Sequence, residues 1–544
     1  MGVAEPSRGA QPSRLDPRSQ TTCADFAKLR PVPDHTTESA RGARPGDPWT
    51  LRCRAVSTLD RQVACPSCGA SVTFKFAGAQ AVVCDYCQAV VARTDRGFEM
   101  QGRMAALLEI PTPLTVGTTG TWNGQRFEVT GRVQMDRAGA PGAPWQEIIV
   151  WLVDEDRTTW VAYAQGNWYA TNETPSPVQL PPPDQLQPGG QVSLGNYGTY
   201  VVQELGQRRT VSGEGSIDAV PKPGVVVRYA DISGPNGAFG TIDWGDGSEA
   251  PTLYLGRQFD PAAMQLDSGF PLEAPTDGVT ELDCPNCGGK LPILSEQTER
   301  VVCQYCGTAS DKTQGSLAML GPAPQPPIMP YIPIGSTGNF RGNDFTVCGF
   351  VIRSCMVEGI VYNWREYLLY GGNSVGYRWL MEEDGAWTFV EPLGAGDVTD
   401  SGNSAMFRGA MYSFKQQVQA KVDYVIGEFY WKVEVGEAVE ATEFQGPGGK
   451  VSREKSPTEV NYSFCSPVNP QEIAAFGVPA PGGGGYGAGA GFGSGMGGGD
   501  DDASNTLGTV IAIIIIICVC IFISMGDGCG GGYGGGYGGP SFGK

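Results

Sequence analysis

The sequence reads CPNCG at Cys284–Gly288 and CQYC at Cys303–Cys306, with fifteen residues between the two cysteine pairs. The same pattern, with the same spacing, stands 219 residues earlier as CPSCG at Cys65–Gly69 and CDYC at Cys84–Cys87. Two CxxC pairs at this distance are typical of a zinc ribbon, in which two short loops face one another. The second occurrence predicts a tandem duplication.

The eight cysteines of these patterns have the spacing and chemistry of metal ligands. Four deprotonated thiols form a tetrahedral cage that zinc accepts readily, and because sulfur fills all four positions, no site is left for water or substrate. We therefore expect two structural zinc ions, one in each ribbon. Disulfide bonds, and iron bound by the same four sulfurs, remain as alternatives. The expected ligands are Cys65, Cys68, Cys84, Cys87, Cys284, Cys287, Cys303 and Cys306.

The segments that follow the two ribbons also repeat. GTTGTWNG at 117–124 matches GSTGNFRG at 335–342, and Trp145–Glu147 matches Trp364–Glu366. Both copies contain short runs rich in aromatic and β-branched residues, such as YVIGEFYWKVEV at 424–435, and Gly, Asn or Asp bounds many of them. Such runs predict strands. The expected fold is mainly β, with two tandem modules, each a small zinc ribbon followed by a β-sandwich or open-barrel domain.

The two ends of the chain differ in composition from these modules. Residues 1–60 are rich in Pro, Arg, Ser and Gly and lack an apolar period, which predicts disorder. Leu507–Met525 contains nineteen residues without a charge. A helix of this length is about 29 Å long, close to the ~30 Å hydrocarbon core of a bilayer. A buried core helix or strand is the alternative, but Gly-rich flanks leave nothing nearby to bury it. We therefore expect one C-terminal transmembrane helix.

These features divide the chain into eight expected parts. They are a disordered extension at 1–60, zinc ribbons at 61–97 and 280–315, β domains at 104–262 and 328–478, a Gly-rich tether at 479–505, a transmembrane helix at 506–525 and a Gly-rich tail at 526–544. Thiols that hold metal need a reducing compartment. We therefore expect the bulk of the chain to face the cytosol and the helix to lie in the lipid bilayer.

Composition argues against two classes of function. His35 is the only histidine, which excludes Ser-His-Asp, Cys-His and His-ligated metal chemistry from the duplicated part of the chain. The chain carries 38 basic and 57 acidic residues, a net charge of −19, whereas nucleic-acid binding needs clustered Lys and Arg. No nucleic acid is expected as a partner, and a zinc-ribbon nucleic-acid binder is the second alternative function.

Two pairs of glutamates match between the copies, Glu147 with Glu366 and Glu214 with Glu428. A carboxylate kept in both copies would serve as a general base or cation ligand if burial raised its pKa. The simpler interpretation is that each glutamate satisfies a backbone turn or an arginine such as Arg365. Because no nucleophile or metal triad accompanies the glutamates, we expect no enzyme. An enzyme of unknown reaction that uses Glu366 and Glu428 is the first alternative.

A candidate partner or ligand surface lies in the second copy, where aromatic residues stand close to these glutamates. Trp and Tyr are enriched in interface hot spots, although aromatic residues also dominate the cores of small β domains. The first copy lacks the FYW run that the second copy has at 429–431. The candidate residues are Trp364, Glu366, Glu428, Tyr430 and Trp431.

The order of a ribbon, GSTG at 335–338, WREY at 364–367, GAW at 385–387 and GEFYWKVEVGE at 427–437 resembles the bacterial family called domain of unknown function 4178. Members of that family are similar in pairing the domain with zinc ribbons and a membrane helix. The resemblance implies bacterial origin, membrane association and a link to envelope stress. The sequence thus predicts a single-pass, tail-anchored protein of the bacterial cytoplasmic (inner) membrane. We expect it to act as a scaffold or sensor that binds an unknown protein partner through its β domains.

Overall fold

The computed structural model describes residues 61–480, apart from Glu109, 139–143, 165, 249, 270–271, 273–278, 314–315 and 322–327. Strands dominate this part of the chain, and its helices are short 3-10 turns. No helix among the described residues is long and apolar enough to cross a membrane. The expected extension at 1–60, the tether beyond residue 480, the transmembrane helix and the tail lie outside the described residues.

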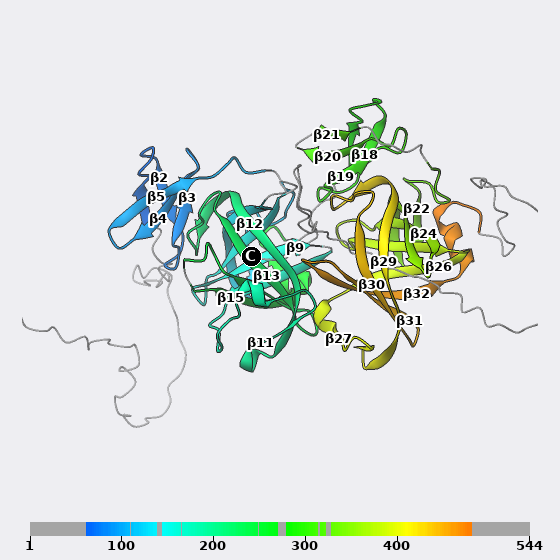
Figure 1. The fold of residues 1–544 in the computed structure, drawn as a ribbon. Helices are drawn as coiled ribbons and strands as arrows, with labels where there is room; N and C mark the ends of the chain where they lie inside the picture. The colour runs from blue at the N-terminus through cyan, green and yellow to red at the C-terminus, as the bar shows by residue number, and fades with distance from the viewer. Residues whose placement is uncertain are drawn as a thin grey trace, which may run out of the picture. The chain divides into compact units, whose positions relative to one another are not determined.

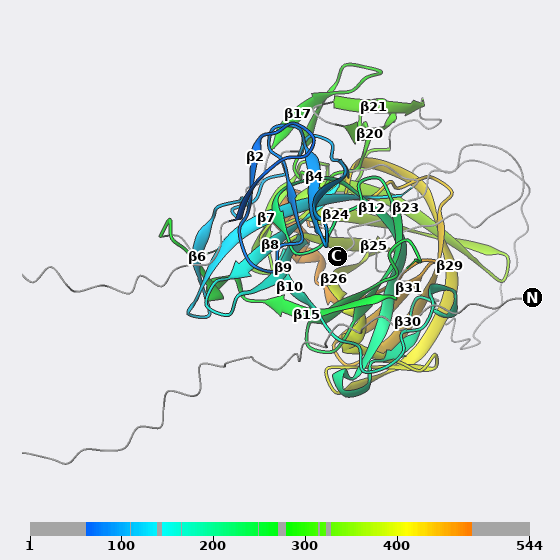
Figure 2. The same ribbon diagram turned by 90° about the vertical axis from the view of Figure 1, so that its left-hand side faces the viewer.

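The first β domain is a closed barrel of eight antiparallel strands. In order round the barrel they are β7 (Gln125–Arg137), β8 (Trp145–Leu152), β9 (Arg157–Ala164), β10 (Asn167–Glu173), β15 (Thr252–Phe259), β14 (Ala238–Asp243), β13 (Val226–Ser233) and β12 (Thr199–Ile217). The pairing of β12 with β7 closes the barrel, and several of these strands are labelled in Figure 2.

The second β domain repeats this arrangement strand for strand. Its barrel runs through β23 (Asn343–Val357), β24 (Ile360–Tyr370), β25 (Tyr377–Glu383), β26 (Ala386–Leu393), β32 (Val460–Val468), β31 (Gly449–Lys455), β30 (Ala438–Gly446) and β29 (Ala410–Phe429) (Figure 1). The pairing of β29 with β23 closes it. The prediction of a mainly β chain with two tandem modules is confirmed, and the expected sandwich or open barrel is corrected to a closed barrel.

A pair of glycines lets the longest strand of each barrel pass close to its neighbour. Gly215 on β12 has φ +75°, and a Cβ atom built on it would lie 2.2 Å from the carbonyl oxygen of Thr130. Gly427 on β29 has φ +101°, and its Cβ would lie 2.3 Å from the carbonyl oxygen of Cys348. A side chain fits at neither position, which is typical of glycine at a barrel corner.

Each ribbon consists of a two-stranded hairpin and a three-stranded part that joins the barrel sheet. In the first ribbon these strands are β1 (Arg61–Ala64) with β2 (Ser71–Phe74), and β3 (Ala81–Val83), β4 (Ala89–Thr94) and β5 (Gly97–Arg103). In the second they are β17 (Thr280–Asp283) with β18 (Lys290–Ile293), and β19 (Arg300–Val302), β20 (Ala309–Thr313) and β21 (Ser316–Gly321). β3 pairs with β12 and β19 pairs with β29. Ribbon and barrel therefore share one sheet in each module.

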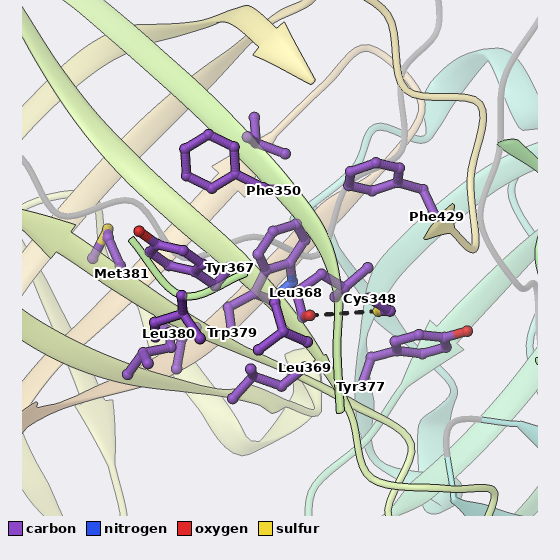
Figure 3. Packing of buried hydrophobic residues seen from close by; sticks show 14 of the residues in the cluster. Cys348, Phe350, Tyr367, Leu368, Leu369, Tyr377, Trp379, Leu380, Met381 and Phe429 are labelled. Carbon is purple, nitrogen blue, oxygen red and sulfur yellow. Dashed lines mark hydrogen bonds between the residues drawn. The ribbon is translucent and has the colours of Figure 1, made fainter. Parts of the chain in front are cut away.

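Short strands extend the two barrel sheets. They are β6 (Thr119–Trp122), β11 (Gln191–Ser193) and β16 (Met264–Leu266) in the first module, and β22 (Thr337–Phe340), β27 (Val398–Asp400) and β28 (Ser404–Phe407) in the second. The largest apolar core lies in the second module. Figure 3 shows part of it, in which the ring centroids of Phe350 and Tyr367 lie 5.1 Å apart. Phe429, at the end of β29, belongs to the same core.

Candidate metal centres and their attachment to the barrels

The eight predicted ligands form two groups of four sulfur atoms, and within each group all four sulfurs lie within 4.8 Å of one another. In the first ribbon, Sγ of Cys65 lies 3.8 Å from Sγ of Cys87. In the second, Sγ of Cys284 lies 3.7 Å from Sγ of Cys306. A tetrahedral ion with metal–sulfur bonds of ~2.3 Å needs sulfur atoms about 3.8 Å apart, whereas a disulfide needs ~2.05 Å. The two groups are therefore placed to hold metal ions.

The tight turns that follow the cysteine pairs have the same backbone in both ribbons. Gly307 has φ +69°, and its N–H donates to the carbonyl oxygen of Cys303 at 2.7 Å. Gln88 stands at the same place in the first ribbon, has φ +52° and donates to Cys84 at 2.8 Å. Left-handed φ is unfavourable for a residue with a Cβ. The ribbon turn thus persists in the first copy without its glycine.

The second metal centre has more polar neighbours than the first. The amide nitrogen Nδ2 of Asn286 lies 3.6 Å from Sγ of Cys306, and the Thr308 hydroxyl lies 3.3 Å from the same sulfur. The corresponding positions in the first ribbon hold Ser67, which also hydrogen-bonds to Cys87, and Ala89, which has no side-chain donor. Hydrogen bonds to a thiolate orient it and stabilise its negative charge. The second sulfur cage is therefore the better supported of the two.

Glu428 fastens the second barrel to the second ribbon. Its carboxylate accepts hydrogen bonds from the backbone N–H of Leu294 at 2.9 Å and of Ser295 at 3.0 Å, and from the Thr298 hydroxyl. The residue is 3% exposed. Burial raises the pKa of Glu428, and these hydrogen bonds oppose the rise. Its oxygens are thus engaged by the ribbon loop that joins β18 to β19.

Strand pairing shows that Glu214 and Glu428 are not equivalent, so this part of the sequence prediction is wrong. Val301 of the second ribbon pairs with Glu428. Val82, at the same place in the first ribbon, pairs with Ser216. The counterpart of Glu428 is therefore Ser216. The letters GE occur in both strands, but when the strands are matched by their pairing, the two GE pairs lie two positions apart.

The other pair, Glu147 and Glu366, is equivalent. Glu147 lies opposite Val133 on the neighbouring strand, and Glu366 lies opposite Val351 at the matching position. Both glutamates are buried, at 2% and 0% exposure. The prediction of a carboxylate common to both copies is therefore confirmed for this pair.

Glu366 belongs to a cluster of charges buried in the second barrel. Its Oε2 lies 3.1 Å from Nε of Arg353, and its Oε1 accepts a hydrogen bond of 2.6 Å from Nε1 of Trp364. Arg353 also lies 3.5 Å from Glu454. Burial raises the pKa of Glu366 to about 7, against the opposing effect of Arg353. The guanidinium thus bridges two carboxylates.

Sequence reasoning missed Arg353 and Glu454, which are 1% and 3% exposed. A signal existed, because Arg353 is the one charged residue in the apolar run from Phe345 to Val357. A charge inside such a strand is buried only when it is paired. Its partners come from distant strands and could not be found by spacing.

The five residues expected to form a partner or ligand surface are all buried. Each is at most 4% exposed, and three of them belong to the apolar core of the second barrel. Two of their aromatic rings, those of Tyr430 and Trp431, pack on one another with centroids 4.8 Å apart. They therefore pack inside the barrel, and one of them, Tyr430, also lines a cavity. The five are Trp364, Glu366, Glu428, Tyr430 and Trp431.

A family model described as a domain of unknown function (DUF4178) matches residues 115–261 and 333–470, together more than half of the chain. The chain belongs to the DUF4178 family. Each match covers one barrel, so the DUF4178 domain is the eight-stranded barrel, present twice. The cysteine ribbons lie outside both matches, although each shares a sheet with its DUF4178 barrel. No curated protein and no solved structure matches the chain.

Proposed function

We propose that this protein is a tail-anchored scaffold or sensor of the bacterial inner membrane that binds a protein partner, with one structural zinc ion in each ribbon. The observation that carries the proposal is the pair of closed four-sulfur groups, each built into the sheet of its barrel. A site closed by four sulfurs offers no open position for substrate. A module with a closed metal site is better suited to binding a partner protein than to catalysing a reaction.

The buried carboxylates support this proposal over an enzyme. Glu428 is occupied by hydrogen bonds from the ribbon loop, and Glu366 faces Arg353 and Trp364. A general base must reach the proton that it removes from a bound substrate. Neither carboxylate is exposed, so an enzyme that uses Glu366 and Glu428 stays the weaker alternative. The net charge of −19 disfavours a nucleic-acid binder in the same way.

Zinc is the proposed ion because four thiolates and a tetrahedral cage match its usual structural site. Elemental analysis of the purified full-length protein is expected to give two zinc ions per chain. Two iron ions per chain would show that the same four-sulfur sites hold iron instead of zinc. A content near zero would contradict the metal centres themselves.

The membrane anchor is proposed from the uncharged stretch 507–525, with the modules on the cytosolic side. Full-length protein is expected in the membrane fraction after carbonate washing, and a variant truncated after residue 505 in the soluble fraction. A membrane-impermeant thiol reagent applied to intact spheroplasts should label Cys529 and spare the ribbon cysteines. Labelling of the ribbons alone would reverse the proposed orientation.

The partner surface must lie outside the five buried candidates, and one exposed apolar tip is the place to test first. Met356, Ile360 and Val361 stand at the hairpin between β23 and β24 and are 70%, 57% and 53% exposed. A photo-crosslinking amino acid at Ile360 is expected to capture one defined protein in intact cells. The matched control is Asp384, at the tip of the hairpin between β25 and β26, and equal capture from both positions would contradict a specific surface.

A further inference from the structure

The second ribbon covers an edge of β29 that the barrel itself leaves open. On one side of β29, β30 pairs with residues 413–421 and then departs. β19 of the ribbon takes over that side and pairs with residues 427–429. Unpaired backbone groups on a strand edge attract other strands and lose protection from solvent. The ribbon therefore completes the sheet where β30 is missing.

Glu428 makes this cover dependent on the shape of the ribbon loop. Its three donors, Leu294, Ser295 and Thr298, all belong to the loop between the two cysteine pairs. A carboxylate that is 3% exposed has no access to water as a replacement. A buried charge left without donors is costly. If the loop loses its conformation, the Glu428 carboxylate is more stable in water than in the protein interior. The end of β29, which carries Glu428, then separates from the ribbon.

Arg300 supplies a second link between the second ribbon and its barrel, because its Nη1 lies 3.7 Å from Oε1 of Glu434, just beyond β29. It lies on β19, its Nε is 2.7 Å from Asp311, and its Nη1 donates to the carbonyl oxygen of Val433 at 2.9 Å. Its side chain is 4% exposed. Arg300 therefore fixes the chain just beyond Trp431 to the same ribbon strand.

The first ribbon lacks both links. Its own ion pair to the barrel joins Lys75 to Glu128 of β7 at 3.2 Å, but the two side chains are 39% and 22% exposed, and an ion pair open to solvent contributes little. Ser216, the counterpart of Glu428, donates to the carbonyl oxygen of Thr73 at 2.9 Å and accepts from the N–H of Lys75 at 3.2 Å. Ala81 stands where the second ribbon has Arg300. A hydroxyl that loses such bonds costs less than a buried charge that loses its donors. The first attachment is therefore the weaker one.

We propose that the second ribbon is a metal-dependent cover for the edge of β29, and that the first ribbon is not coupled to its barrel in this way. The proposal rests on the metal centres proposed above. With the metal lost, loop 294–298 loses its shape, Glu428 loses its donors, and the run from Gly427 to Trp431 becomes accessible. The device would make the second barrel responsive to metal loss.

The test is backbone hydrogen exchange in the full-length protein in mild detergent, with and without a high-affinity zinc chelator. After chelation, peptides that cover residues 425–433 are expected to exchange at least tenfold faster. Peptides that cover residues 213–219, the same place in the first barrel, are expected to change less than threefold. Equal changes in both, or continued protection of 425–433 after the metal has left, would overturn the proposal.

Two variants separate the coupling from the metal site. Glu428→Gln is expected to keep both metal ions and to raise exchange at 425–433 without chelator. Thr298→Val removes only one donor and is expected to give a smaller increase, which keeps the test open if Glu428→Gln does not fold. Ser216→Ala is the matched control and should leave exchange of the second barrel unchanged.

Metal content and hydrogen exchange test two different claims, the presence of the metal centres and the coupling of the second ribbon to β29. A protein that contains no metal would refute the proposed metal centres. A protein that contains two metal ions but keeps residues 425–433 protected after chelation would refute only the coupling. Capture of a partner at Ile360 is independent of both results.

Discussion

The two barrels hold their buried arginine on different strands. In the first barrel Arg208 stands on β12, and in the second Arg353 stands on β23. Strand pairing places Met135 at the position of Arg353, and Ala420 at the position of Arg208. At these two positions each barrel thus has one arginine, and each lacks it where the other has it.

Both arginines nevertheless serve the same pair of acidic positions. Arg353 lies 3.1 Å from Glu366 and 3.5 Å from Glu454. Arg208 forms an ion pair with Asp243, which occupies the position of Glu454, and the charge of Glu147 raises its pKa further. Both copies therefore retain a buried arginine between two acidic residues, although the arginine stands at a different position in each. A buried carboxylate needs a cation, and the long arginine side chain reaches it from either neighbouring strand.

Metal loss should separate the two modules most clearly, because structural zinc contributes on the order of 10–16 kcal/mol of coupled binding and folding free energy. Cys68→Ser and Cys287→Ser are each expected to reduce the metal content from two ions to one and to unfold the ribbon concerned. Proteolysis should then cleave only the first ribbon in Cys68→Ser. In Cys287→Ser it should also cleave near Trp431. Identical cleavage patterns would remove the distinction between the ribbons.

Moving the arginine from one strand to the other tests whether its two positions are interchangeable. Arg353→Met leaves two buried carboxylates without a cation and is expected to lower the free energy of unfolding of the second barrel by about 3–5 kcal/mol. Adding Ala420→Arg, which copies the first barrel, should restore at least half of the loss. Pulse proteolysis in a urea series measures both variants.

Ala420→Arg alone is the control for this pair, and it should destabilise because it adds a second buried cation. A double variant no more stable than Arg353→Met would mean that the arginine positions are not interchangeable. The reverse exchange, Arg208→Met with Met135→Arg, tests the first barrel in the same way.

The pH dependence of the second barrel is the next effect in size. Burial raises the pKa of Glu366 to about 7, above its ordinary value of 4.5. The folded state therefore binds more protons than the unfolded state between these values. The stability that Glu366 contributes through this shift is complete below pH 4.5 and is lost as the pH rises to about 7, a total change of about 3 kcal/mol. Stability measured at pH 5 should exceed that at pH 8, and Glu366→Gln should reduce the difference. If stability depends on pH in Glu366→Gln as it does in the unmodified protein, the pH dependence comes from another group.

Gly215 and Gly427, at which the longest strand of each barrel passes close to its neighbour, should tolerate substitution equally badly. This is the smallest of the expected effects. Gly215→Ala and Gly427→Ala each place a Cβ within 2.3 Å of a carbonyl oxygen. Each is expected to cost about 1–3 kcal/mol through overpacking and the positive φ. Thermal unfolding of the two variants, followed by proteolysis of each barrel, checks the equality. A loss confined to one barrel would show that closure differs between the copies.

Local pattern was enough to predict the ribbons, the duplication and the shared position of Glu147 and Glu366. Cysteine spacing is set by the geometry of one small site, so it can be read directly. Closure of the barrels depends on the pairing of β12 with β7, between residues about 80 positions apart in the chain. No local period records such a pairing, which explains why an open barrel or sandwich remained possible.

The candidate site was harder to predict than the fold. Aromatic residues such as Trp431 serve cores and interfaces equally well, and only their neighbours decide between the two. The matching letters GE predict Glu214 as the counterpart of Glu428, whereas the pairing of the strands assigns Ser216. Arg353 has partners on other strands, which sequence spacing does not bring together.

The different attachments of the two ribbons also bear on how the chain assembles. A ribbon is complete long before its barrel strand is synthesised, since β19 pairs with residues that follow it by more than 120 positions. In a chain with two similar copies, a ribbon can dock on the wrong barrel, which is a common error of repeated domains. The first ribbon has Ala79 where the second has Thr298, and Ala81 where it has Arg300. On the second barrel the first ribbon would leave Glu428 short of a donor, so the unequal attachments disfavour docking of the first ribbon on the second barrel.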